Sequence, residues 1–95
     1  MERINNLRDK IDEIDKQMAK LFEQRMLLVK EIANVKKEIN YPIYDQGRET
    51  FVLIRNGAYI ENKDIRIMYF DMLSKQFELT KKMQEEILHP NKEFG

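Results

Sequence analysis

Apolar residues recur at alternating intervals of three and four positions along the first 39 residues. This spacing places them on one side of an α-helix, as a heptad seam. No glycine or proline interrupts the stretch, because the first proline is Pro42 and the first glycine is Gly47. The pattern therefore predicts one long helix from about residue 3 to residue 39. The seam consists of Ile4, Leu7, Ile11, Ile14, Met18, Leu21, Leu28, Ile32, Val35 and Ile39.

The length of this helix predicts an oligomer. The helix spans about 54 Å, whereas a compact chain of this size has a radius of gyration of only about 12–13 Å. The rest of the chain is too short to cover the whole seam. We therefore expect a homodimer in which two long helices pack along each other in antiparallel orientation.

A short second helix is expected after the long one. The segment 40–42 ends the first helix, because the residue before a proline disfavours the helical conformation. Asp45 is a suitable N-cap for a helix over about 46–56. Gly57 suits the C′ position that closes such a helix.

A third helix is expected after a loop at about 58–62. Asn62 or Asp64 can cap its start, and Pro90 stops it after about His89. Every predicted element is helical, so the fold class is all-α with one long, one short and one long helix in each chain. We expect one helical domain over residues 1–90 and a loose C-terminal tail over 91–95.

Charge and composition exclude several classes of function. Seventeen basic and seventeen acidic residues give a formal net charge of zero, which argues against a general nucleic-acid binder. The absence of cysteine excludes disulfides and thiolate chemistry. No apolar run is long enough to span a membrane, and the N-terminus lacks the apolar core of a signal peptide. A cytoplasmic location is therefore expected.

Arg25 is the one polar residue in the seam. A buried, unpaired guanidinium costs several kcal/mol, an order-of-magnitude value, so an anionic group must meet it. That group can be Glu23, Asp15 or a carboxylate of the partner chain, or the side chain can extend to solvent. Alternatively, Arg25 lines a pocket for an anionic ligand, because its planar fork can hold a carboxylate with two hydrogen bonds.

Further polar residues can share that pocket. Lys36 follows Arg25 by eleven residues and lies on a similar face of the helix. Asp45, Arg48 and Glu49 open the second helix, where they can also form a plain surface cluster.

The third helix carries an inward stripe in which two positions are polar. Thr80 and Gln84 either cross-link helices or face the pocket of Arg25, because buried polar groups need partners. The stripe consists of Phe70, Leu73, Phe77, Thr80, Gln84 and Ile87.

Arg8 lies near the N-terminus of the first helix. It can pair with Asp12 on the surface or reach the middle of the partner's long helix.

Three short motifs together resemble the all-helical chorismate mutases. They are Leu-Arg-Asp-Lys-Ile-Asp-Glu-Ile-Asp at 7–15, Leu-Phe-Glu-Gln-Arg at 21–25 followed by Val-Lys at 35–36, and Pro-Ile-Tyr-Asp-Gln-Gly-Arg-Glu at 42–49. Each motif is weak alone, but their order and spacing are specific, and the resemblance covers about residues 4–88. It implies an intertwined homodimer of three-helix chains.

The resemblance also implies the residues of the active site. That family places a serine and a glutamine four residues apart near the end of the third helix. Thr80 and Gln84 match this spacing, although a rival register places Phe77 and Lys81 there. The family's roles fall on Arg25, Lys36, Asp45, Arg48 and Glu49 of one protomer, with Arg8 contributed by the other.

The implied reaction is the intramolecular [3,3] rearrangement of chorismate to prephenate, in the biosynthesis of phenylalanine and tyrosine. It needs no cofactor and no metal. By this resemblance Arg8, Arg25 and Arg48 bind the substrate carboxylates, while Lys36 and Gln84 act on the ether oxygen. The two carboxylate side chains bind the ring hydroxyl.

Three alternatives remain open from the sequence. One is a lyase on the same scaffold that eliminates pyruvate from isochorismate. Another is a non-catalytic helical dimer that binds a metabolite for regulation. The third is a plain antiparallel coiled coil, in which Arg25 has an internal carboxylate partner.

Overall fold

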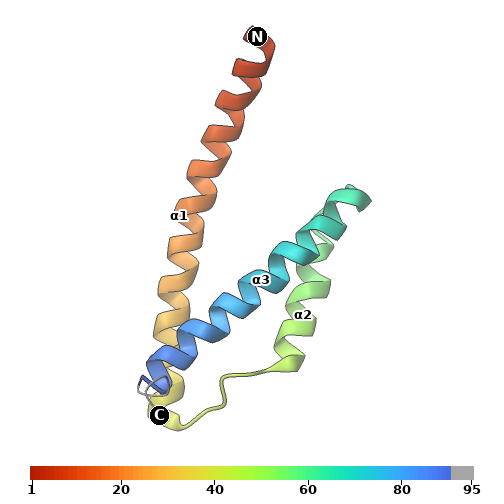
Figure 1. Cartoon of the computed structure of the whole chain (residues 1–95). Helices are drawn as coiled ribbons and strands as arrows, with labels where there is room; N and C mark the ends of the chain where they lie inside the picture. The colour runs from red at the N-terminus through yellow and green to blue at the C-terminus, as the bar shows by residue number, and fades with distance from the viewer. Residues whose placement is uncertain (91–95) are drawn as a thin grey trace.

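The computed structural model describes residues 1–90 and contains three α-helices there (Figure 1). The helices are α1 (Glu2–Ile39), α2 (Gln46–Gly57) and α3 (Lys63–Leu88). Their order and lengths agree with the long, short, long pattern expected from the sequence. The predicted tail over 91–95 lies outside the described residues.

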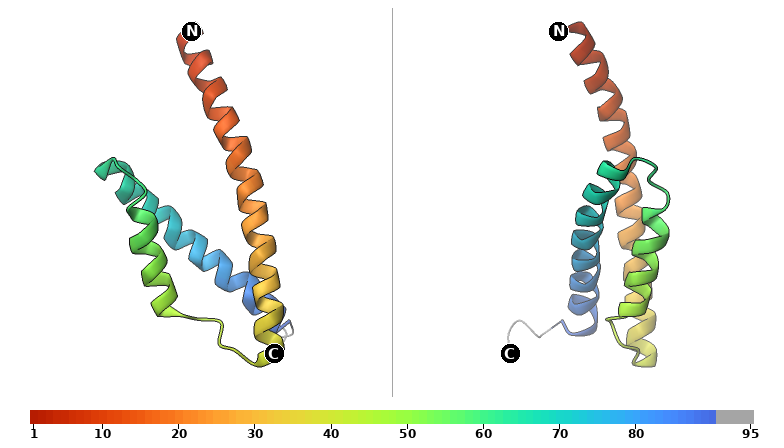
Figure 2. Two further views of the ribbon diagram at one scale, coloured as in Figure 1. Left: turned by 180° about the vertical axis from the view of Figure 1, so that it is seen from behind. Right: turned by 90° about the vertical axis from the view of Figure 1, so that its right-hand side faces the viewer.

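The helices form an elongated body with one free arm. α2 and α3 lie beside the C-terminal half of α1, and the N-terminal half of α1 extends beyond them (Figure 2). The principal dimensions are 54 × 26 × 22 Å. α3 meets α1 near the C-terminal ends of both helices and diverges from it toward its own N-terminus (Figure 1).

The helix ends follow the predicted signals at three places. Asn40 adopts a left-handed conformation with φ of 56° and ends α1, a conformation that asparagine tolerates better than most residues. The Asp45 side chain accepts a hydrogen bond from the backbone N–H of Arg48 and caps α2. Asn62 caps α3 in the same way, through the N–H of Ile65.

The expected role of Gly57 is wrong. It is the last residue of α2 and its φ is not positive, so it is not a left-handed C′ residue. It is instead buried against α3, where an added Cβ would lie 2.6 Å from Cε1 of Phe70. A close helix–helix approach, not a turn, therefore requires glycine at this position.

The buried apolar core of a single chain is small. Its buried apolar side chains are Val29 and Ala33 of α1, Val52 of α2 and Leu73 of α3. The heptad seam lies on a different face of α1 and remains exposed; Leu21, near its middle, retains 60% of its accessible surface. The single chain thus leaves its longest apolar stripe uncovered.

Candidate active site

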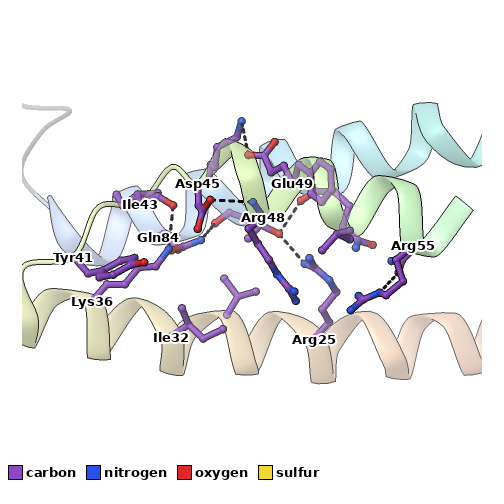
Figure 3. Close-up of a pocket in the computed structure, with 17 residues that line it drawn as sticks. Arg25, Ile32, Lys36, Tyr41, Ile43, Asp45, Arg48, Glu49, Arg55 and Gln84 are labelled. Atoms are coloured by element: carbon purple, nitrogen blue, oxygen red, sulfur yellow. Dashed lines mark hydrogen bonds and ion pairs between the residues drawn. The ribbon is translucent and has the colours of Figure 1, made fainter.

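A cavity of about 370 Å³ lies between the C-terminal half of α1, the connection 41–45, α2 and α3 (Figure 3). The three helices and the connection all contribute side chains to its wall. The predicted site residues that line it are Arg25, Lys36, Asp45, Arg48, Glu49, Thr80 and Gln84.

Arg25 is fixed by α3 on one side of this cavity. Its Nη1 donates a hydrogen bond of 2.7 Å to Oγ1 of Thr80, and that hydroxyl donates in turn to the carbonyl of Gln76 at 2.8 Å. The Thr80 hydroxyl therefore acts as an acceptor toward the guanidinium. This contact uses one of the five N–H groups of Arg25, so most of its donors can serve a ligand.

Lys36 is fixed about three turns further along α1. Its Nζ donates to Oε1 of Gln84 at 2.8 Å and to the carbonyl of Ile43 at 3.0 Å. Gln84 is 5% exposed, and its Nε2 lies 3.4 Å from the carbonyl of Thr80. An ammonium group has three protons, so one remains for a ligand.

The electrostatics of the cavity favour an anion. Burial lowers the pKa of Arg25; Tyr69 opposes this shift, while the neighbouring Arg48 adds to it. Burial likewise lowers the pKa of Lys36, and Asp45 opposes it. Their surroundings thus destabilise both cations, and a bound anion would offset the cost of desolvation and repulsion.

The opening of α2 supplies the carboxylates. Asp45 lies at the N-cap, and Glu49 forms an ion pair with Lys81, with 3.4 Å between Oε2 and Nζ. Arg48 extends from α2 toward α1 (Figure 3). Both registers proposed for α3 place side chains at the cavity, Thr80 and Gln84 in one and Phe77 and Lys81 in the other. Thr80 and Gln84 are the pair that makes the hydrogen bonds to the α1 cations.

Arg8 is not in this cavity. It is exposed on the free arm of α1, about 25 Å along the helix from Arg25 at 1.5 Å per residue. The chain does not bring the two residues together, and the expected contribution of Arg8 across a dimer interface stays a prediction.

Sequence reasoning missed several groups that line the cavity. Arg55 follows Arg48 by seven residues, so its place on the same face of α2 was readable from the helical period. Lys81 appeared only as part of a rival register, because its pairing with Glu49 depends on how α2 packs on α3. The carbonyl of Ile43 carries no side-chain signal at all.

The described part of the chain offers neither a metal-binding cluster nor a membrane-spanning helix. Within residues 1–90, no three acidic, histidine or cysteine side chains gather in a way that can hold a metal ion. No helix in the same range has the length and apolarity needed to cross a bilayer.

Relatives with assigned names match the chain over nearly its full length. A chorismate mutase of Methanocaldococcus jannaschii is 35% identical over 97 residues, which cover 97% of this chain and 98% of the relative. The T-protein of Haemophilus influenzae is 38% identical, and a bifunctional chorismate mutase/prephenate dehydratase of Aquifex aeolicus is 29% identical. This chain corresponds to 24% and 28% of those two longer proteins.

The family comparison agrees with these relatives. No solved structure matches the chain significantly. The sequence pattern of the family described as chorismate mutase type II matches residues 7–89, a range that contains the whole cavity. From this match and the full-length similarity to the Methanocaldococcus jannaschii relative, the chain belongs to the type II chorismate mutase family.

Proposed function

We propose that this protein is an isomerase that converts chorismate to prephenate by an intramolecular [3,3] rearrangement. The observation that carries the proposal is the pair of fixed cations in one cavity: Arg25 is held by Thr80, and Lys36 is held by Gln84. Chorismate is a dicarboxylate, and a cavity with several cations suits it. The relative of the same length is named a chorismate mutase.

The reaction is unimolecular, so the enzyme acts by positioning the substrate and by electrostatic stabilisation. Arg25 and Arg48 hold the carboxylates and favour the compact conformer in which the reacting carbons meet. The partner's Arg8 completes this grip. Arg25 suits the task because its remaining N–H groups form a planar fork.

Lys36 and Gln84 stabilise the charge that develops in the transition state. As the C–O bond breaks, the ether oxygen becomes more negative. The Gln84 amide is oriented by Lys36, because Oε1 accepts from the ammonium and leaves Nε2 as the donor end. Nε2 and the remaining proton of Lys36 then donate to the ether oxygen, and these bonds strengthen as the charge grows.

Glu49, with Asp45 nearby, accepts a hydrogen bond from the ring hydroxyl. Asp45 already accepts from the N–H of Arg48 and Glu49 already pairs with Lys81, but each carboxylate keeps further acceptor sites for the hydroxyl. Thr80 acts on the substrate indirectly, since its hydroxyl sets the position of the Arg25 guanidinium.

A homodimer is part of this proposal. The chain has an accessible surface of 8132 Å², whereas a compact 11.5-kDa monomer exposes about 5800 Å². The excess is larger than the roughly 800 Å² that each partner buries in a standard interface. A second copy laid along the seam would cover it and bring the partner's Arg8 to this cavity.

The test is the disappearance of chorismate absorbance on addition of the purified protein, with identification of the product. Formation of prephenate supports the proposal. Isochorismate is the control substrate, since release of pyruvate from it without turnover of chorismate would select the lyase instead. A folded dimer that is inactive on both compounds would favour a metabolite-binding module.

A further inference from the structure

Lys81 connects three segments at the mouth of the cavity. Its Nζ lies 3.4 Å from Oε2 of Glu49 on α2 and 4.9 Å from the centre of the Tyr44 ring on the α1–α2 connection. The Lys81 side chain is 40% exposed and that of Glu49 is 25% exposed. Figure 3 shows Glu49 on the side of the cavity away from α1.

The charges that line the cavity explain why this contact matters. Arg25, Lys36, Arg48 and Arg55 also line it, so cations outnumber carboxylates. A Glu49 carboxylate without a partner of its own would be drawn to one of these cations. Such a pair would occupy a guanidinium that a substrate carboxylate needs, and would turn Glu49 away from a ligand hydroxyl.

We infer that Lys81 is a positioning residue: it holds Glu49 at the α2 side of the cavity and thereby leaves the arginines free to bind the two carboxylates of the substrate. This inference rests on the proposed function. The ammonium group acts through Glu49 and not by direct contact with the ligand. The effect belongs to substrate binding, because the same contact is present before and during the reaction.

The first measurement is the separation of KM from kcat in Lys81→Met. A partly exposed ion pair supports only a modest effect, so KM for chorismate is expected to rise about three- to fivefold, with kcat within about twofold of the parent. Lys81→Arg should restore the parent KM, because it keeps a cation at the same place. Lys75→Met is the matched control, since it removes an exposed Lys–Glu pair from the same helix.

The second measurement is a double-mutant cycle with Glu49→Gln. If Lys81 acts through Glu49, Lys81→Met should have no further effect on kcat/KM in the Glu49→Gln background. The initial slope of rate against substrate gives kcat/KM even when that variant is weak. Helical circular dichroism and thermal melting of each variant confirm that it is folded.

The outcomes separate this inference from the proposed function. Losses that add in the cycle would show that Lys81 touches the ligand directly, and would overturn the inference while the mutase reaction stands. An unchanged KM in Lys81→Met, or a loss confined to kcat, would also overturn it. Failure of the parent protein to convert chorismate would remove the proposed function and this inference together.

Discussion

At the scale of single residues, the chemistry of this protein depends on cations held by neutral partners. Arg25 was recognisable from the sequence as an exception in an apolar seam, and Thr80 and Gln84 as polar members of an apolar stripe. The sequence did not reveal that these exceptions bind one another, because contacts of Arg25 with Thr80 and of Lys36 with Gln84 span 55 and 48 residues.

The pH dependence of activity should report Lys36. Burial lowers its pKa below the ordinary value of 10.5, and a neutral amine cannot stabilise negative charge on the ether oxygen. Gln84 needs no proton, so we expect kcat/KM to persist to mildly alkaline pH. The value of kcat/KM should then fall as the free enzyme loses the Lys36 proton, at a pH below the pKa of an ordinary lysine side chain.

Two substitutions check this assignment. Asp45 opposes the shift of the Lys36 pKa, so Asp45→Asn should lower that pKa further and move the alkaline limb to lower pH. Asparagine still caps α2, which keeps the helix start intact. Lys36→Arg should remove the limb from the measurable range. A limb that stays in place in both variants would assign it to another group.

At the scale of elements, the helices and the inward stripe of α3 followed from the sequence, but the face that α1 buries within one chain did not. The seam was taken as the apolar side of α1, yet the single chain buries Val29 and Ala33, which lie beside the seam. Periodicity identifies an apolar stripe about 100° wide on the helix surface. Tertiary packing decides which residues in or beside that stripe are buried within the chain. The need for glycine at position 57 was equally hidden from the sequence, because the Phe70 ring that requires it lies on α3.

Gly57→Ala should therefore destabilise the protein although alanine favours helices. Its methyl group would lie 2.6 Å from the Phe70 ring, and overpacking of this kind costs about 1–3 kcal/mol. Gly47→Ala is the control within the same helix, because its methyl group would only reach ordinary contact with Asp45 at 3.4 Å. Alanine there should raise stability by up to about 1 kcal/mol.

Urea denaturation of both variants measures the difference. Phe70→Leu should recover part of the stability in the Gly57→Ala background, because it removes the ring that the methyl group meets. Equal stability of the Gly57→Ala and parent proteins would show that the α2–α3 contact adjusts without cost.

At the scale of the whole molecule, the chain is too extended for its size. Its radius of gyration is 17.1 Å, compared with about 12–13 Å for a compact chain of this length. The sequence indicated this excess through the length of one uninterrupted helix. It predicted that part of the helix stays uncovered by its own chain, but not that this part is the N-terminal half.

Mixing two inactive variants tests the dimer and the place of Arg8 together. Arg8→Ala and Arg25→Ala should each form folded dimers with little activity. After unfolding and joint refolding, half of the dimers are mixed and each mixed dimer has one intact site, so about a quarter of the parent activity should return.

The matched control combines Arg25→Ala with Lys36→Ala. Both residues line the cavity of the same chain, so every site in the mixed dimers is damaged and no activity should return. Absence of recovery in the first mixture, when mixed dimers are present, would contradict a shared site.

The uninterrupted α1 also constrains how the length of this protein can change during evolution. One residue inserted between Arg8 and Arg25 would turn the two arginines relative to each other by about 100° and separate them by about 1.5 Å more. An insertion of seven would restore the facing but displace Arg8 by about 10 Å. Insertions and deletions among relatives should therefore be rare within α1. They should occur mainly in the connections 40–45 and 58–62, where a change of length does not alter the relative positions of Arg8 and Arg25.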